Sequence, residues 1–357
     1  MNIPITFRLL LMVALSHSFI MQAQSYSTDK TENPSLRYFN QEVEKRKTPL
    51  STEGKFINEE FPFGPNFQDF RKWKKQENPY QEEKKNSHWR LQAVRDFSWK
   101  DNNDDFIMWL GHATFLIRMS GQYLLTDPVF GKASLVHTRY SPLPFPVEQL
   151  PPIDLILLSH NHRDHFSKSS LKQIQKKNPQ VKIFTGLKME RWLKGMFKQE
   201  ALQTAGWYQQ FEHDHFQITF LPTRHWAKRG LFDFNDQLWG AFVIKVNERT
   251  IYFGGDTGYG SHLREAGEWF QPDYVILGIG AYQPEWFMEC NHISPTRAIG
   301  AFQEMHAKWM IPMHYGCFDL SNESLEDPIR VYKEVKSKQP NPDSFLHPVP
   351  GEIIWMK

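Results

Sequence analysis

The chain has little cysteine, little net charge and no internal repeat of solenoid length. Its 357 residues include two cysteines, Cys290 and Cys317. An even count permits one disulfide in an exported protein, but we expect two free, partly buried thiols and no cysteine nucleophile. Lysine and arginine number 42 against 40 acidic residues, and the net charge of +2 is too small to indicate a nucleic-acid partner.

A hydrophobic run long enough to cross a membrane is also lacking near the N-terminus. Arg8 precedes an apolar stretch over residues 9–15, and Ala23 offers a small residue for signal peptidase. The stretch is well short of the ~20 apolar residues that a transmembrane helix needs. We therefore expect a secretory signal peptide over residues 1–23 rather than an uncleaved anchor. No cysteine lies near the cleavage point, so we expect no lipoprotein anchor. The signal peptide leads us to expect an exported protein, either periplasmic or membrane-associated.

Residues 24–100 are polar, charged and poorly periodic, and we interpret them as an N-terminal arm. In the arm, residues 61–75 (FPFGPNFQDFRKWKK) place aromatic side chains beside cations. Such a segment could make a peripheral contact with an anionic membrane. We favour packing on the catalytic domain with the cations solvated, because Pro62, Gly64 and Pro65 argue against an amphipathic helix.

The most informative segment is residues 159–165, SHNHRDH. It follows the apolar run 153–158, which is typical of a buried strand, so a rigid sheet would hold the loop that bears it. Imidazole and carboxylate groups together suit zinc or iron, and this spacing allows one loop to bind two neighbouring ions. The segment supplies four candidate ligands: His160, His162, Asp164 and His165.

Three more candidate ligands each follow a strand-like run. His225 follows residues 218–223, Asp256 follows 250–255, and His314 follows 308–313. One ion could be held by His160, His162 and His225, and a second by Asp164, His165 and His314, with Asp256 bridging the two. Two such ions can activate a water and stabilise a displacement reaction. In that reaction Asp256 would orient the water and accept its proton.

Other histidines have simpler interpretations. We expect His112, at the start of a strand, to have a structural or supporting role rather than to bind metal. His213 and His215 stand in what the sequence predicts to be an exposed turn, and we do not expect them to be ligands.

Beyond the arm, residues 101–357 are expected to form one catalytic domain in which strands alternate with helices. Strand candidates besides those named are residues 106–110, 115–119, 123–126, 181–185, 241–246 and 274–279. Helix candidates are residues 168–177, 189–198, 296–305 and 328–338. Strands grouped with helices on both sides indicate an α/β sandwich, with the metal site at one edge between two sheets.

These motifs resemble the metallo-β-lactamase superfamily, whose defining pattern is H-x-H-x-D-H followed by a later His, Asp and His. Within it, the chain is similar to the N-acylphosphatidylethanolamine-hydrolysing phospholipase D family. The similarity covers about residues 106–328 and rests on WLGHAT (109–114), LTDP (125–128), SHNHRDH (159–165), HWAKR (225–229), LWG (238–240), GGDTGY (254–259), IGAY (279–282), WFM (286–288) and HYG (314–316).

The resemblance implies an αββα sandwich, two zinc ions (other divalent metals are also open) and a homodimer. It also implies that Asp127 supports the metal loop from behind and that His292 is a catalytic, substrate-facing group. The implied reaction is hydrolysis of the phospholipid to N-acylethanolamine and phosphatidic acid. The alternative is a lactonase-like hydrolysis of a small anionic or phosphorylated metabolite. Arg163 and Asn291 depart from the mammalian pattern (Tyr and Gln) and are expected at the substrate entrance.

Overall fold

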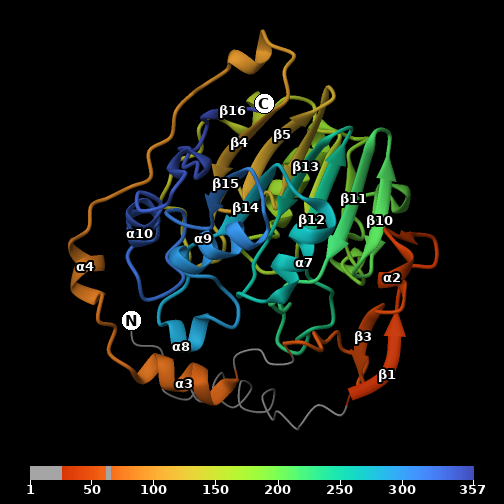
Figure 1. The fold of residues 1–357 in the computed structure, drawn as a ribbon, viewed down its shortest axis with the longest axis horizontal. Helices are drawn as coiled ribbons and strands as arrows, with labels where there is room; N and C mark the ends of the chain where they lie inside the picture. Colours follow the sequence, from red (N-terminus) through yellow and green to blue (C-terminus); the bar gives the residue numbers. More distant parts are fainter. Residues whose placement is uncertain (1–25, 62–65) are drawn as a thin grey trace, which may run out of the picture.

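Two seven-stranded sheets face each other in the computed structural model, which describes residues 26–61 and 66–357 (Figure 1). The first sheet has the order β15-β14-β13-β12-β11-β10-β2, the second has the order β16-β4-β5-β6-β7-β8-β9, and β1 pairs with β3 separately. The strands are β1 (Tyr26–Thr31), β2 (Arg37–Tyr38), β3 (Thr48–Ser51), β4 (Phe106–Gly111), β5 (Thr114–Met119), β6 (Gln122–Thr126), β7 (Leu155–Leu158), β8 (Lys182–Gly186), β9 (Leu202–Ala205), β10 (Gln209–His213), β11 (Phe216–Leu221), β12 (Ala241–Val246), β13 (Arg249–Phe253), β14 (Tyr274–Gly278), β15 (Trp309–Met313) and β16 (Ile353–Trp355).

Helices cover the outer face of each sheet. The α-helices are α2 (Gln41–Glu44), α3 (Phe67–Lys75), α4 (Gln81–Asn86), α5 (Lys168–Lys177), α6 (Glu190–Leu193), α7 (Ser261–Phe270), α8 (Glu285–Met288), α9 (Pro295–Glu304) and α10 (Asp327–Lys336). Short 3-10 turns are η1 (Ser98–Lys100), η2 (Val147–Gln149), η3 (Gln199–Ala201) and η4 (Pro342–Ser344). Figure 1 shows α7 and α9 in front of the first sheet, and α10 beside α9.

The side chains of β4 and β7 show how the layers form. Alternate residues of a strand point to opposite faces of its sheet. In β4, Ile107 and Trp109 pack in the core between the sheets, whereas Phe106 and Met108 pack in a second core with α5 and α6. Both faces are therefore buried, which explains the uninterrupted apolar runs in the sequence and confirms the αββα sandwich.

Strand direction brings the candidate ligands to one edge. In the second sheet β6, β7, β8 and β9 run parallel, and in the first sheet β13, β14 and β15 run parallel. β11 is antiparallel to β12, which is antiparallel to β13, so β11 and β13 point the same way. The segments after β6, β7, β11, β13 and β15, which hold Asp127, residues 159–165, His225, Asp256 and His314, thus leave the carboxyl ends of their strands.

Most of the predicted elements are present, with two clear differences. The expected helix 189–198 is limited to α6, since Lys194 already has an extended backbone (ψ 132°) and the chain then turns at Gly195, where φ is +83°. Several elements were not expected, among them β9, β10, β16 and α7. The signal-peptide prediction lies outside the described residues. Within the described part of the chain, no helix is both long and apolar enough to cross a membrane.

The arm packs on the catalytic domain over its described residues. β2 pairs with β10 and extends the first sheet. The prediction that residues 61–75 would not be helical is wrong for α3, because Pro62, Gly64 and Pro65 all precede its cap, Asn66. In α3, Trp73 stacks on Phe287 with ring centroids 5.0 Å apart and donates Nε1–H to Asn322. This is the packing that the sequence favoured.

Candidate metal centre

The structure brings all seven candidate ligands together at the carboxyl edge between the sheets. Four overlapping groups of side chains could each hold a metal ion, since within each group one donor atom per residue lies within 4.8 Å of the others. Two of these groups have four members: the first group is His160, His162, His225 and Asp256, and the second is Asp164, His165, His314 and His112. The two smaller groups are Asp127, His160 and His165, and Asp256, His292 and His314. The division between the two larger groups matches the one expected from the sequence, apart from the addition of His112.

In the first group three imidazole nitrogens converge. His162 Nδ1 lies 2.9 Å from His160 Nε2 and 3.1 Å from His225 Nε2. A hydrogen bond needs one N–H and one lone pair, so three nitrogens that meet in this way cannot all satisfy one another. Their arrangement is that of lone pairs directed at one cation.

In the second group, Asp164 Oδ2 lies 3.6 Å from His165 Nε2 and 3.5 Å from His314 Nε2. His112 Nε2 approaches the same oxygen to 3.0 Å, and its ring is 4.0 Å from that of His314. His112 is therefore either a hydrogen-bond partner of Asp164 or a further ligand. The short contact to the carboxylate favours the first role, which agrees with the supporting role expected from the sequence.

Asp256 faces both groups. Its Oδ1 lies 3.1 Å from His165 Nε2 and 3.2 Å from His314 Nε2. Its Oδ2 lies 3.7 Å from His225 Nε2 and 3.9 Å from His160 Nε2. A carboxylate with one oxygen toward each group has the arrangement that a bridging ligand requires.

Hydrogen bonds to Nδ1, on the side of the ring away from the centre, orient three of the imidazoles. His165 Nδ1 donates to Asp127 Oδ2 at 2.8 Å, and Asp127 is fully buried. Ser159 Oγ donates to Asp127 Oδ2 and lies 2.9 Å from His160 Nδ1, while His225 Nδ1 lies 3.2 Å from the carbonyl oxygen of Asn291. These bonds place the N–H of each ring at Nδ1 and leave the Nε2 lone pair directed at the centre. Asp127 thus lies where the sequence analysis expects it.

Burial and mutual proximity shift the titration of these groups. Burial holds the pKa of His160 and His225 well below the usual value and lowers that of His162 to about 4. Burial alone raises the pKa of Asp256, but His165 and His314 outweigh it and hold that pKa well below its usual range. Burial also lowers the pKa of His314, yet Asp256 and Asp164 raise it to about 9. A proton on His314 is therefore favoured beside these carboxylates in the metal-free chain, and a metal would displace it.

The residues fit bound metal. Three buried donor atoms at the centre have no hydrogen-bond partner among the described residues: His165 Nε2, Asp256 Oδ1 and His314 Nε2. Neither Asp164 nor Asp256 forms an ion pair with Lys or Arg in the described part of the chain. Nitrogen and carboxylate donors without thiolates suit zinc, iron or a similar divalent ion.

His292 lies at the open side of the centre. Its Nδ1 is 3.9 Å from Asp256 Oδ2, and its ring centroid is 5.2 Å from that of His314. The side chain keeps 17% of its surface exposed. His292 can therefore meet a molecule that enters the centre, as the resemblance implied.

The two residues that depart from the mammalian pattern differ in their surroundings. Arg163 is exposed and donates from Nη2 to the carbonyl oxygen of Arg229 at 3.3 Å, so its side chain lies at the surface. Asn291 is only 4% exposed, and it contributes its backbone carbonyl to His225. The prediction that Asn291 faces the substrate entrance is therefore wrong. The residue is buried and supports His225 through its backbone carbonyl.

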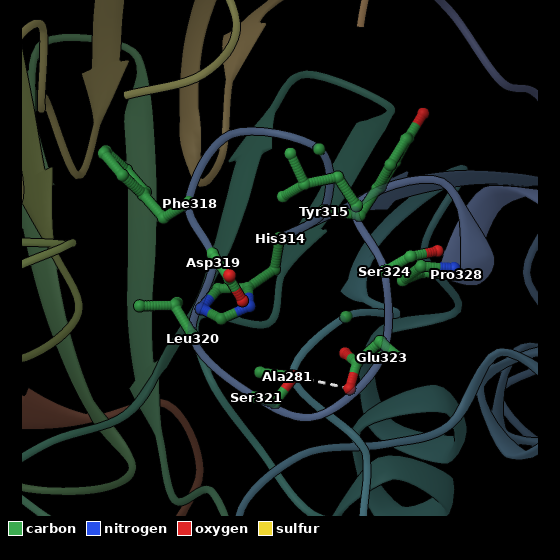
Figure 2. Close-up of a pocket in the computed structure, with 13 residues that line it drawn as sticks. Ala281, His314, Tyr315, Phe318, Asp319, Leu320, Ser321, Glu323, Ser324 and Pro328 are labelled. Atoms are coloured by element: carbon green, nitrogen blue, oxygen red, sulfur yellow. Dashed lines mark hydrogen bonds between the residues drawn. The ribbon is translucent and has the colours of Figure 1, made fainter. Parts of the chain in front are cut away.

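Two features near the centre were not found from the sequence. His262, at the start of α7, is buried with Nε2 2.8 Å from Thr257 Oγ1, which also accepts the backbone N–H of Arg224. This pair links the loops that carry His225 and Asp256, and no pattern in the sequence indicates it. A pocket with room for roughly one water molecule, about 20 Å³, adjoins His314 and is lined by residues of the loop from Phe318 to Pro328 (Figure 2).

The cysteines and the remaining histidines agree with the sequence analysis. Both Cys290 and Cys317 are free, and Cys317 is buried where its sulfur accepts the backbone N–H of His112. Neither His213 nor His215 belongs to a group of ligands in the described residues. They flank the turn between β10 and β11.

Comparison with known proteins agrees with this geometry. The family model of the β-lactamase superfamily domain matches residues 122–315. N-acyl-phosphatidylethanolamine-hydrolyzing phospholipase D 1 of Caenorhabditis elegans is 34% identical over 266 residues, covering 70% of this chain and 75% of that protein. The mitochondrial protein of the same description from Saccharomyces cerevisiae is 29% identical over 236 residues, covering 62% of this chain and 49% of that protein.

Among solved structures, the isothiocyanate hydrolase from Delia radicum gut bacteria aligns with a TM-score of 0.57. The alignment covers 70% of this chain and 98% of that one at 18% identity, so the likeness is one of fold. The matched domain, the sandwich and the paired ligand groups lead to one conclusion: the chain belongs to the metallo-β-lactamase superfamily and is one of its metal-dependent hydrolases.

Proposed function

We propose that this chain is a phosphodiesterase of the phospholipase D type. It would hydrolyse N-acylphosphatidylethanolamine to N-acylethanolamine and phosphatidic acid. The observation that carries this proposal is the 34% identity to the Caenorhabditis elegans protein described by that reaction, on a chain whose seven candidate ligands come together in one centre.

Two zinc ions are the proposed cofactors. His160, His162 and His225 would hold one ion, Asp164, His165 and His314 the other, and Asp256 would contact both through its two oxygens. Bound there, the ions would polarise the phosphoryl oxygens and lower the pKa of the attacking water towards ~7.

Residues of the chain have the remaining tasks. Water adds to phosphorus while the bond from phosphorus to the ethanolamine oxygen breaks, so one proton must leave the water and one must reach the departing oxygen. Asp256 lies between the ligand groups, where it can orient the water and hold its proton. His292, on the open side, can donate an N–H to a phosphoryl oxygen or to the departing oxygen.

Arg163 is proposed to bind the phosphate at the entrance. Its guanidinium is exposed, and no ion pair with Asp or Glu occupies it among the described residues. A charge-assisted contact of this kind is typically worth ~1.5–3 kcal/mol. The same contact would suit a phosphorylated lactone, which is why the substrate has to be tested directly.

The test uses the zinc-loaded full chain with two substrates. One is N-acylphosphatidylethanolamine in detergent micelles, and the other is a phosphorylated sugar lactone. We expect mass spectrometry to detect N-acylethanolamine and phosphatidic acid in stoichiometric amounts, and to detect no product after a chelator has removed the metal. Opening of the lactone with the lipid left intact would replace this proposal by the lactonase-like function.

A further inference from the structure

Two surface turns hold pairs of large apolar side chains in solvent. In the first, Leu135 is 97% exposed and Val136 is 81% exposed. In the second, Leu231 is 57% exposed and Phe232 is 72% exposed. These are the four most exposed large hydrophobic side chains among the described residues, and together they form what we call the apolar tips.

The second turn is built to keep its tip outward. Asp233, only 4% exposed, accepts backbone N–H groups from Gly230 at 2.7 Å and from Arg229 at 3.2 Å. These bonds close the turn around Leu231 and Phe232. Exposure of the two side chains is therefore a consequence of a hydrogen-bonded conformation.

In the first turn a serine hydroxyl, not a carboxylate, accepts the backbone N–H groups. Ser134 Oγ accepts backbone N–H groups from Val136 at 3.3 Å and from His137 at 3.1 Å. The backbone N–H of Ala133 donates to the carbonyl oxygen of His137 at 3.1 Å, which closes the turn. Two unrelated segments thus present an apolar pair in a defined geometry.

Both turns are fixed to loops of the metal centre. Beside the second turn, Arg229 Nη1 donates to the carbonyl oxygens of Asn161 at 3.1 Å and Phe166 at 2.9 Å, on either side of the H-x-D-H segment. Beside the first turn, the backbone N–H of Tyr140 donates to the carbonyl oxygen of Cys317 at 2.8 Å, three residues after His314. Both turns are therefore hydrogen-bonded to segments that carry or adjoin proposed metal ligands.

Aromatic rings connect the second turn to the centre itself. The Trp226 ring lies 4.5 Å from the ring of His162 and 5.6 Å from that of Phe234. Phe234 follows the exposed Phe232 by two residues. Aromatic contacts thus join the segment that follows the turn to a proposed metal ligand.

The exposed charges beside the apolar tips are cations. Lys132, Arg163 and Lys168 are exposed beside the turns, and Lys228 is half-buried. Over residues 130–140, 163–169 and 226–233 the carboxylates are Asp164, a proposed metal ligand, and Asp233, which is 4% exposed and accepts the N–H groups that close its turn. A rim with cations and no free carboxylate is complementary to an anionic surface.

We propose that the apolar tips dock this chain onto an anionic phospholipid bilayer with the metal centre facing the lipid. Because the proposed substrate is a phospholipid, this inference rests on the proposed function. The four side chains would enter the boundary between headgroups and acyl chains, and the surrounding cations would contact lipid phosphates. A substrate molecule could then reach the centre along Trp226 without leaving an apolar environment.

A second copy of the chain is the less suitable occupant of this face. A twofold interface places the same patch of each copy against the other. Cations such as Lys132 and Arg163 would then oppose cations. A bilayer that contains acidic lipid instead presents negative headgroups to these cations and can bury all four apolar side chains.

The test measures vesicle binding by flotation of the zinc-loaded full chain. Vesicles of phosphatidylcholine are compared with vesicles of phosphatidylcholine and phosphatidylglycerol. The variants are Leu231→Ser with Phe232→Ser, and Leu135→Ser with Val136→Ser. Ser134 and Asp233, which close the turns, are unchanged, so the turns should still form. Val94→Ser is the matched control, since Val94 is 41% exposed and lies in neither turn.

We expect binding to the acidic vesicles, and a loss of about tenfold or more for each tip variant, with none for the control. Equal binding by the tip variants and the unmodified chain, or no vesicle binding at all, would overturn the inference. Conversion of a dimer to a monomer by the tip substitutions without a change in vesicle binding would assign the face to a second copy. Vesicle binding through the tips without hydrolysis of N-acylphosphatidylethanolamine would instead refute the proposed function alone.

Discussion

Asp127 is the carboxylate on which both halves of the metal centre depend, and its replacement gives the sharpest test of the site. One oxygen accepts the backbone N–H of Ser159 at 2.8 Å. The other accepts His165 Nδ1–H at 2.8 Å and the hydroxyl of Ser159 at 2.5 Å, and that hydroxyl lies 2.9 Å from His160 Nδ1. Asp127 thereby orients one proposed ligand in each group.

The expected size of the effect follows from these contacts. Asp127→Asn keeps the volume and one carbonyl oxygen, but an amide N–H₂ would then face the donors of His165 and Ser159. Loss of such a partner typically lowers metal affinity by about 10- to 100-fold, or about 1.4–2.8 kcal/mol. We expect the larger loss for the ion in the second group, because His165 bonds Asp127 directly whereas His160 is reached through Ser159.

The assay is titration of metal-free protein with zinc against a competing chelator, together with kcat, KM and the thermal midpoint of the metal-free form. Asp154→Asn is the matched control. Asp154 also accepts a backbone N–H, that of Tyr123 at 2.8 Å, but it lies at the opposite end of β7 from the centre. The Asp154→Asn variant should therefore bind zinc with the affinity of the unmodified chain.

Unchanged zinc affinity in Asp127→Asn would refute the orienting role. A fall in the thermal midpoint of the metal-free protein, with kcat and zinc affinity intact, would show that Asp127 serves the fold alone. Equal losses in the Asp127 and Asp154 variants would also count against the reasoning, because only one of the two contacts the ligands.

Three further predictions concern the centre. Asp256→Ala should lower metal content from two ions towards one and reduce kcat by at least about 100-fold, measured by elemental analysis and turnover; a fully active variant would contradict the bridging role. His292→Ala should keep both ions and lower kcat, so loss of metal in that variant would place His292 among the ligands. Arg163→Tyr should keep metal content and raise KM for short phosphodiesters more than for long-chain lipids by about tenfold; an equal effect on both would refute the entrance role.

Sequence patterning predicted the layers because the physics that forms them is local. The apolar runs that became β4, β7 and β12 are buried on both faces, and their ends were correct to within two residues. Failures occurred where one or two residues redirected the chain. Lys194 and Gly195 end α6 early, and Asn66 starts α3 immediately after a segment whose prolines argued against a helix.

The candidate site was predictable for a related reason. Each ligand directly follows a strand, and strands that point the same way deliver their ends to one edge. The types of side chain were also sufficient to propose metal chemistry, since three histidines and an aspartate rarely gather within one short loop for structural reasons alone. Asn291 and His262 were not predictable in this way. Asn291 was expected at the entrance but is buried, and His262 was given no role but contacts Thr257, the residue after Asp256.

By itself the sequence determined which residues could bind metal and that two sheets would carry them, because ligand chemistry and strand periodicity are properties of short segments. Only the tertiary structure decided which oxygen of Asp256 faces which group, that Asp127 reaches His165 and His160, and that Leu135 and Phe232 are exposed beside the centre. These facts depend on distances between segments far apart in the chain. Such distances are set by how the sheets, helices and turns pack together, which no short segment specifies.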